Sequence, residues 1–352
     1  MAVIFTKSLL NNNLLHVHNN NVIEFTGSGA SPTVKCTLSI GTRSFVLYPS
    51  PAGVFYFNFK DYARVLFANF NDTLIVDYNV TSQFYDVGIL EIDYNLSILH
   101  LDNSTDVYSQ LLTFTNSKQN SKEVKDVSGT YFESAKNIKI WQGYPFDLSL
   151  YNGIKITSDN INFVEAVSGG NYRFVLSDGL NFDVSNLLPN KDKLYFYGEG
   201  NGLIAIINFE AITSPCTNSH YIKWFNRYGG WSYWLFERGK INRTAKEIGQ
   251  LNNDFDNFNT SISRTISLGR NSKDTLTVIS DVITNEYLDL LVDLIDTPKI
   301  YLFTGTPNTV ATIYDWLEIE LKNTTIPVQE PIRDIHDITF TFDLPENYTQ
   351  TL

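Results

Sequence analysis

Carboxylates in a short aromatic segment are the residues best placed for acid–base chemistry. Within Asp315–Glu320, Glu318 and Glu320 are two positions apart, so both would point to one face of a β-strand. Cleavage of a glycosidic bond needs two carboxyl groups about 5–9 Å apart, which this spacing allows. The alternation of Leu317 and Ile319 with these carboxylates is equally typical of any half-exposed strand. We therefore interpret the segment as a strand and expect no catalytic residue in it.

Histidine and cysteine offer no stronger site. His16 and His18 would share one face of a strand and could bind a metal ion, but no third ligand is near them in the sequence. We interpret them as part of a solvated strand face. Cys36 and Cys216 are 180 positions apart, which argues against a disulfide framework and gives no metal-binding spacing. We expect two small buried side chains and no metal site.

Motifs for other chemistries are missing from the sequence. It has no G-x-S-x-G nucleophile motif, and no cysteine is paired with a histidine. The glycine-rich stretch Gly198–Gly202 lacks the lysine of a phosphate-binding loop, and counted from Gly198 it has no glycine at the third glycine position of the dinucleotide-binding motif G-x-G-x-x-G. The sequence therefore predicts a protein that is not an enzyme and that binds no cofactor.

An aromatic hairpin is the most distinctive predicted element. The runs Tyr221–Phe225 and Trp231–Phe236 alternate, and Asn226–Gly230 between them supplies the asparagine and glycines of a chain reversal. Alternation divides their side chains between two faces, with Ile222, Trp224, Trp234 and Phe236 on the first and Lys223, Trp231 and Tyr233 on the second. We expect the first face to pack on a core and the second to be available to a sugar or a protein.

Composition and charge narrow the class of protein. The chain has 352 residues, enough for two or three domains, and is 43% hydrophobic and 14% aromatic, which favours strands. A net charge of −12 argues against nucleic-acid binding and against adhesion to an anionic membrane. No stretch approaches the ~20 apolar residues of a membrane span, and the N-terminus does not resemble a signal peptide. We expect a soluble protein made in a cytoplasm.

Turn signals and changes in polarity predict three domains in a mainly β fold of tandem β-sandwich domains followed by an α+β domain. Residues 1–117 would form a β-sandwich-like domain with a short helix over Asp61–Ala68. Residues 118–213 would form a small antiparallel sandwich of the immunoglobulin or fibronectin kind. Residues 214–352 would form an α+β sandwich-type domain with the hairpin and one helix over Asn285–Ile295.

Details of the chain between these elements are also predicted. Thr284 is the expected N-cap of the helix over Asn285–Ile295, and Pro298 is expected to end it. The polar stretches Thr115–Thr130 and Lys240–Phe258 are predicted to be long excursions that become ordered on assembly.

Three runs of sequence resemble a known group of proteins. They are GVFYFNF with DYARVLF (Gly53–Phe59 and Asp61–Phe67), the run Tyr221–Phe236, and the C-terminal stretch Asp337–Leu352. All resemble virion structural proteins of tailed phages that infect gut Bacteroidota, the crAss-like phages. The resemblance implies a non-catalytic scaffold of the tail or tail hub. It also implies a C-terminal domain similar to tail-tube and distal-tail folds.

The expected function is therefore a ring-forming component that links parts of a phage tail. Its partners would be further copies of itself, in six- or twelve-fold rings, and other virion tail proteins, with no membrane and no sequence-specific nucleic acid. It would be made in the bacterial host cytoplasm and reside in the virion. The alternatives are a receptor- or glycan-binding tail adaptor, a head-associated structural protein, and a depolymerase enzyme.

Aromatic and basic residues of the hairpin region are the predicted contacts with these partners, because aromatic side chains dominate protein interfaces. They are Trp231, Tyr233, Tyr228, Arg227 and Arg238. We expect Arg227, Arg238 and Arg243 to lie opposite acidic side chains of a neighbour.

Overall fold

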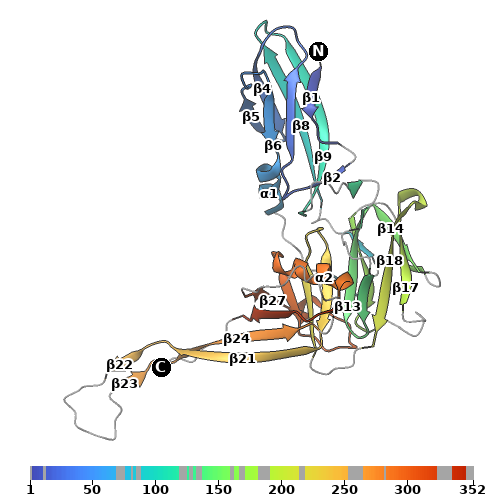
Figure 1. Cartoon of the computed structure of the whole chain (residues 1–352), viewed down its shortest axis with the longest axis vertical. Helices are drawn as coiled ribbons and strands as arrows, with labels where there is room; N and C mark the ends of the chain where they lie inside the picture. Colours follow the sequence, from blue (N-terminus) through green and yellow to red (C-terminus); the bar gives the residue numbers. More distant parts are fainter. Residues whose placement is uncertain are drawn as a thin grey trace. The chain divides into compact units, whose positions relative to one another are not determined.

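The chain folds mainly into β-strands, with two short α-helices in the part that the structure describes (Figure 1). The computed structural model describes residues 2–10, 13–68, 76–80, 82–84, 89–118, 125–126, 130–131, 137–158, 162–165, 171–180, 191–213, 219–252, 265–280, 283–322 and 335–345. It contains two compact units. The first comprises Met1–Ile212, Asn226–Trp231 and Pro307–Ile313, and the second comprises Thr213–Phe225, Ser232–Thr306 and Tyr314–Leu352.

Two sheets form the N-terminal part of the first unit. In order across the first sheet, the strands are β1 (Val3–Lys7), β3 (Val22–Gly27) and β6 (Phe55–Asn58). In order across the second sheet, they are β10 (Lys125–Asp126), β2 (Asn13–His16), β9 (Thr105–Thr115), β8 (Ile89–His100), β4 (Thr33–Ile40) and β5 (Arg43–Leu47). β8 and β9 form a long antiparallel hairpin. Every second residue of β8 from Ile92 to Ile98 is buried, as the two-residue period of a strand requires.

An aromatic-rich core lies between these two sheets. The rings of Phe25 and Phe55 stack with centroids 5.4 Å apart, and the ring of Phe59 lies 5.1 Å from that of Tyr94. Helix α1 (Lys60–Ala68) packs against the same cluster. The predicted sandwich with one short helix is confirmed.

The rest of the first unit contains two further sheets. In the first of these, the strands in order are β11 (Thr130–Tyr131), β13 (Pro145–Tyr151), β16 (Asn171–Asp178) and β7 (Ser82–Phe84). In the second, they are β12 (Asn137–Trp141), β18 (Leu203–Ile212), β17 (Lys191–Gly198), β14 (Gly153–Thr157) and β15 (Asn162–Glu165). β7 precedes residue 117 but pairs with β16, whereas β10 follows that residue but pairs with β2. Strand pairing therefore crosses the predicted 117/118 boundary in both directions.

A single curled sheet organises the second unit. Its strands in order are β20 (Trp231–Phe236), β19 (His220–Phe225), β26 (Ile300–Phe303), β27 (Trp316–Leu321), β29 (Thr339–Asp343), β24 (Arg270–Ile279) and β21 (Arg238–Glu247). β20 and β21 are at opposite edges of this order, yet only Glu237 separates them in the sequence. The sheet must therefore curl until its two edges meet at this residue. Two short pairs, β25 (Ile283–Thr284) with β28 (Ile335–His336) and β22 (Gln250–Asn252) with β23 (Thr265–Ser267), complete the unit.

One helix packs on this sheet, as the sequence predicts. Helix α2 (Asn285–Val292) continues into a 3₁₀ turn over Asp293–Ile295, so the predicted helix is confirmed over its whole length. Thr284 occupies the N-cap position, but its side chain makes no capping hydrogen bond. The ring of Tyr287 lies 5.5 Å from that of Trp234, which places the helix on the first face of the hairpin.

The polar stretch Lys240–Phe258 was expected to be a long excursion that becomes ordered only on assembly, but its first part already forms strands in the single chain. β21 and β22 occupy it, while residues 253–258 lie outside the described part of the chain. All residues of β21 are exposed, so the strand has no alternating buried face to detect in the sequence. Its pairing with β24, from Arg238–Ile279 to Glu247–Arg270, fixes it instead.

Candidate interaction sites

The aromatic hairpin β19–β20 has the two faces that the sequence predicts, but both are buried. Trp224 and Phe236 of the first face are fully buried. On the second face, Trp231 and Tyr233 each expose only 3% of their surface, so the expectation of a solvent-exposed face is wrong. Part of the cover comes from β27, where the ring of Trp316 lies 6.3 Å from that of Tyr233.

The presence of Lys223 explains why the second face of the hairpin was expected to be exposed to solvent. A lysine in an alternating strand usually indicates solvent, yet this side chain is fully buried. Its Nζ lies 4.0 Å from the ring centroid of Trp316 and 5.8 Å from that of Tyr301. A desolvated ammonium gains about 2 kcal/mol or more from an aromatic face, which offsets part of the cost of its burial. Lys223 is therefore part of an internal cation–π cluster.

The turn of the hairpin is fixed by its own side chain and by the first unit. Oδ1 of Asn226 accepts hydrogen bonds from two backbone N–H groups of the turn, each at 3.0 Å. Gly229 has a φ of 93°, a left-handed value that favours glycine. The backbone N–H of Lys118 donates to the carbonyl of Arg227 at 2.7 Å, which ties the turn to the residues after β9.

A buried ion pair supports Trp231 from β16. Arg173 donates from Nε and Nη2 to the two carboxylate oxygens of Asp147, at 2.6 and 2.8 Å, and the two side chains are 3% and 0% exposed. The Cζ of Arg173 lies 5.8 Å from the ring centroid of Trp231. Trp231 therefore contacts another strand of its own chain.

Of the five predicted partner contacts, three are buried and two are at the surface. Tyr228, Trp231 and Tyr233 are buried, whereas the side chains of Arg227 and Arg238 are exposed. The guanidinium of Arg227 donates a hydrogen bond to the hydroxyl of Tyr228 at 2.8 Å and lies over its ring. Only the two arginines thus present their side chains to a partner without a change in the fold.

The carboxylate pair Glu318 and Glu320 lies on one exposed face of β27, as predicted. The two side chains line an open groove of about 660 Å³, together with apolar residues such as Ile319 and with Lys299 and Lys322. Neither glutamate forms an ion pair with another described residue. The arrangement fits the exposed face of a strand, and a catalytic role is not part of our interpretation.

The two histidines near the N-terminus have separate environments. His16 is buried, and its Nδ1 lies 2.7 Å from Oγ of Ser117, so the expected solvated face is wrong for this residue. His18 is exposed, with Nε2 3.2 Å from Oδ1 of Asn116. The sequence misses the difference because strand β2 ends at His16 and its residues Leu14, Leu15 and His16 are all buried, without the alternation that was expected.

One of the two cysteines is buried, as the sequence predicts. Cys36 is buried and unbridged, and burial raises the pKa of its thiol to about 12. Cys216 lies outside the described residues. Within the described ranges, no group of three or more His, Cys, Asp or Glu side chains is arranged to hold a metal ion.

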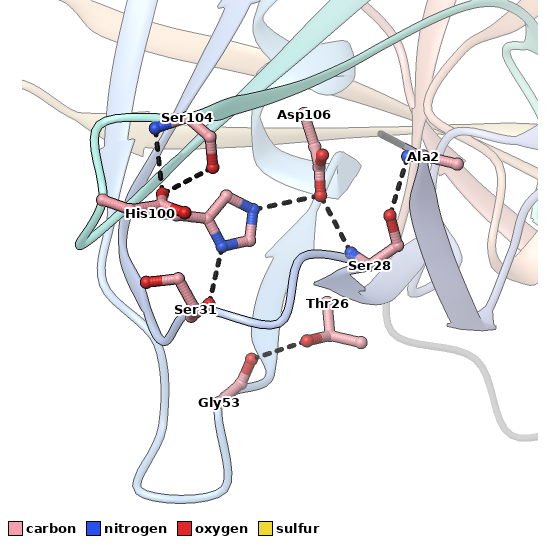
Figure 2. A network of polar contacts seen from close by, with 9 residues as sticks. Ala2, Thr26, Ser28, Ser31, Gly53, His100, Ser104 and Asp106 are labelled. Atoms are coloured by element: carbon pink, nitrogen blue, oxygen red, sulfur yellow. Dashed lines mark hydrogen bonds and ion pairs between the residues drawn. The ribbon is translucent and has the colours of Figure 1, made fainter.

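A buried polar network around His100 was missed by sequence analysis (Figure 2). His100 ends β8 and Asp106 is near the start of β9, and both side chains are fully buried. Nε2 of His100 lies 3.1 Å from Oδ2 of Asp106, and Nδ1 lies 2.8 Å from the carbonyl oxygen of Ser31. The same carboxylate oxygen accepts a hydrogen bond from the backbone N–H of Ser28 at 2.8 Å. The network joins the β3–β4 loop to the β8–β9 hairpin.

The hydrogen bonds of this network suit a structural role and do not suit general-base catalysis. Both ring nitrogens of His100 face acceptors, so both carry a proton and the imidazole is charged. The hydrogen bond to the carbonyl of Ser31 raises the pKa of His100, as does Asp106, against the lowering effect of burial. An imidazolium with both protons engaged has no lone pair for general-base catalysis. His100 therefore holds two loops together.

Two glycines leave room for the histidine ring. A Cβ at Gly27 would lie 2.6 Å from Cε1 of His100, and a Cβ at Gly29 would lie 2.7 Å from the same atom. Because hydrogen bonds hold the ring on both sides, it cannot move aside. The only signal in the sequence is the Gly-Ser-Gly run, which has no meaning until β4 is known to pair with β8.

A two-stranded ribbon projects from the second unit (Figure 1). β29 pairs with β24 only from Thr275 to Ile279, so beyond that point β21 and β24 pair with each other alone, and β22 and β23 extend them. We call residues 242–252 and 265–274 the ribbon arm. Three apolar side chains on it are exposed to 40% or more of their surface, namely Ile248, Leu251 and Ile266.

Replacement of Trp231 by alanine is expected to lower the free energy of unfolding by about 3–5 kcal/mol, because it leaves a cavity and removes the ring beside Arg173. Urea unfolding measures this loss. Tyr314→Ala is the matched control, since Tyr314 is 88% exposed and should change stability little. Unchanged unfolding of Trp231→Ala, combined with lost self-association, would show that Trp231 faces a neighbour instead.

The stability of the chain is expected to fall as the pH rises through the folded-state pKa of His100. This pKa is above its ordinary value of 6.5, so the stabilisation is complete below that value and is lost at higher pH. Urea unfolding from about pH 5 to pH 9 measures it, and NMR titration of the His100 ring gives the pKa directly. His100→Gln should lose this part of the pH dependence. An identical profile for both proteins would contradict the charged state of His100.

Comparison with known proteins leaves the family open. No protein-family model matches the chain, and no curated protein matches it. Among solved structures, fibronectin(III)-like modules of Clostridium thermocellum CbhA are 7% identical, with 60% of this chain and 94% of theirs covered, at a TM-score of 0.22. The Ig1-2 module of the Drosophila receptor protein tyrosine phosphatase DLAR is 9% identical, with 60% and 100% covered, at a TM-score of 0.18. Likenesses this distant carry no argument about function.

Among the described residues, no helix has the length and apolar character needed to cross a membrane.

Proposed function

We propose that this chain is a non-enzymatic structural protein of a phage virion, which forms rings in the tail or tail hub and links parts of the tail. The observation that carries the proposal is the ribbon arm, an element with both faces exposed in the single chain. The resemblance of Gly53–Phe67 and Tyr221–Phe236 to virion proteins of crAss-like phages supports the assignment to a tail.

Such an arm has little stability of its own. A two-stranded ribbon alone in water is marginally stable, because it buries little apolar surface. Leu251 and Ile266 are directly opposite each other on the arm and are 56% and 40% exposed. Contact with another protein would remove these side chains from water and would use the unpaired backbone edge of β21. The arm is thus better suited to an assembly than to a monomer.

A ring is compatible with the geometry of such a contact. The arm is one surface, and whatever receives it on a second copy is a different surface, so the contact is head-to-tail. Head-to-tail contacts produce rings when the rotation between copies closes. Other virion tail proteins would bind the remaining surfaces, and the protein would reside in the virion after synthesis in the host cytoplasm.

The glycan- or receptor-binding alternative needs exposed aromatic platforms. Trp231 and Tyr233, the aromatic residues expected to provide one, are buried. The carboxylate pair Glu318 and Glu320 lines an open groove, but its position on a regular strand face is explained without catalysis. We therefore place the structural role first.

Native mass spectrometry of the purified chain, with negative-stain images of the same sample, tests the proposal. We expect closed rings, six- or twelve-fold, because the arm supplies a head-to-tail contact. Three-fold assemblies would favour a head-associated role instead. A monomer at every concentration, together with specific signals on a glycan array, would overturn the ring proposal in favour of the adaptor.

A further inference from the structure

The two faces of the ribbon formed by β21 and β24, which continues outward as the ribbon arm, differ in their charges. On one face, Arg243 of β21 is opposite Asp274 of β24, and its guanidinium donates to both carboxylate oxygens at 2.7 Å. Farther out on the same face, Glu247 is opposite Arg270. Each basic side chain on this face therefore has an acidic side chain of the same chain directly across from it.

On the other face, all charged side chains of β21 and β24 are basic. Arg238, Lys240 and Lys246 alternate with the residues of the balanced face, so all three point the opposite way, and Lys273 joins them from β24. Lys273 pairs with Asp343 at 2.7 Å. Lys240 and Lys246 form no ion pair with any described residue, and both are exposed. No acidic residue of β21 or β24 lies on this face.

The charge of the ribbon is opposite to that of the rest of the chain. The segment Arg238–Asp274 contains seven basic and four acidic residues, a formal charge of +3. Since the whole chain carries −12, the remaining residues carry −15. Exposed carboxylates without an ion pair among the described residues, such as those of Glu318 and Glu320, belong to that remainder. A second copy of this chain therefore offers the ribbon a surface of opposite sign.

We propose that the basic face of the ribbon, through Lys240 and Lys246, binds an acidic surface of a second copy of this chain. This proposal rests on the proposed ring assembly and specifies its chemistry. Opposite potentials would steer the arm onto its neighbour and reject contact between two arms, which repel each other. The balanced face, already satisfied within the chain, would carry no such attraction.

Charge reversal on the basic face tests this proposal. The variant Lys240→Glu/Lys246→Glu should weaken self-association by about tenfold or more, and added salt should weaken the wild-type assembly in the same way. Lys7→Glu/Lys35→Glu is the matched control, because it changes the net charge equally at exposed lysines of the N-terminal sandwich. Analytical ultracentrifugation at two salt concentrations measures all three proteins. Circular dichroism checks that each variant is folded.

Zero-length carbodiimide cross-linking of a mixture of unlabelled and ¹⁵N-labelled chains identifies the contact. We expect mixed-isotope peptides in which Lys240 or Lys246 is joined to a carboxylate of the other copy. Rings of unchanged affinity in the Lys240→Glu/Lys246→Glu variant would overturn the proposed contact while leaving ring formation intact. A wild-type monomer would overturn ring formation itself. Wild-type rings that resist the variant, together with duplex-DNA binding that the variant loses, would assign the basic face to nucleic acid instead.

Discussion

The hairpin formed by β19 and β20 can leave neither of its faces in water, because each carries large aromatic rings. On one side, Tyr287 of helix α2 packs against Trp234, and Phe340 of β29 packs against Phe236. On the other side, Tyr233 packs with aromatic rings of β27, and Arg173 lies against Trp231. The turn of this hairpin belongs to the first compact unit and most of its strands to the second.

Regular apolar patterns made much of this fold predictable. The buried face on which Trp224 lies follows from the two-residue period of a strand, and the helix over Asn285–Ile295 follows from a period of 3.6 residues. Both are found in the structure. The features that were not predicted involve polar residues. The burial of Lys223 depends on rings far along the chain, and the network of His100 depends on a loop brought to it by strand pairing. β21 has no buried face at all, so only its partner strand reveals it.

Most of the predicted contact residues lie in the hairpin, whereas the basic surface that we propose as a contact lies on the strand that follows it, β21. Aromatic side chains are often interface anchors, yet this hairpin needs the same side chains to complete its own core. The exposed surface is formed instead by the lysines of β21, which give no strong individual signal in the sequence. Their significance depends on which charges lie directly opposite them on β24, and this register cannot be read from the sequence.

The short connection at Glu237 has a mechanical consequence. β20 of the hairpin passes almost directly into β21, and β24 returns beside it to pair with β29 over Thr275–Ile279. A pull along the ribbon would therefore load the hydrogen bonds of the curled sheet together, in shear, and would not open them one at a time from an end. A tensile load on the arm would be shared by the buried core of the second unit, so the ribbon would behave as a tether anchored in its strongest part.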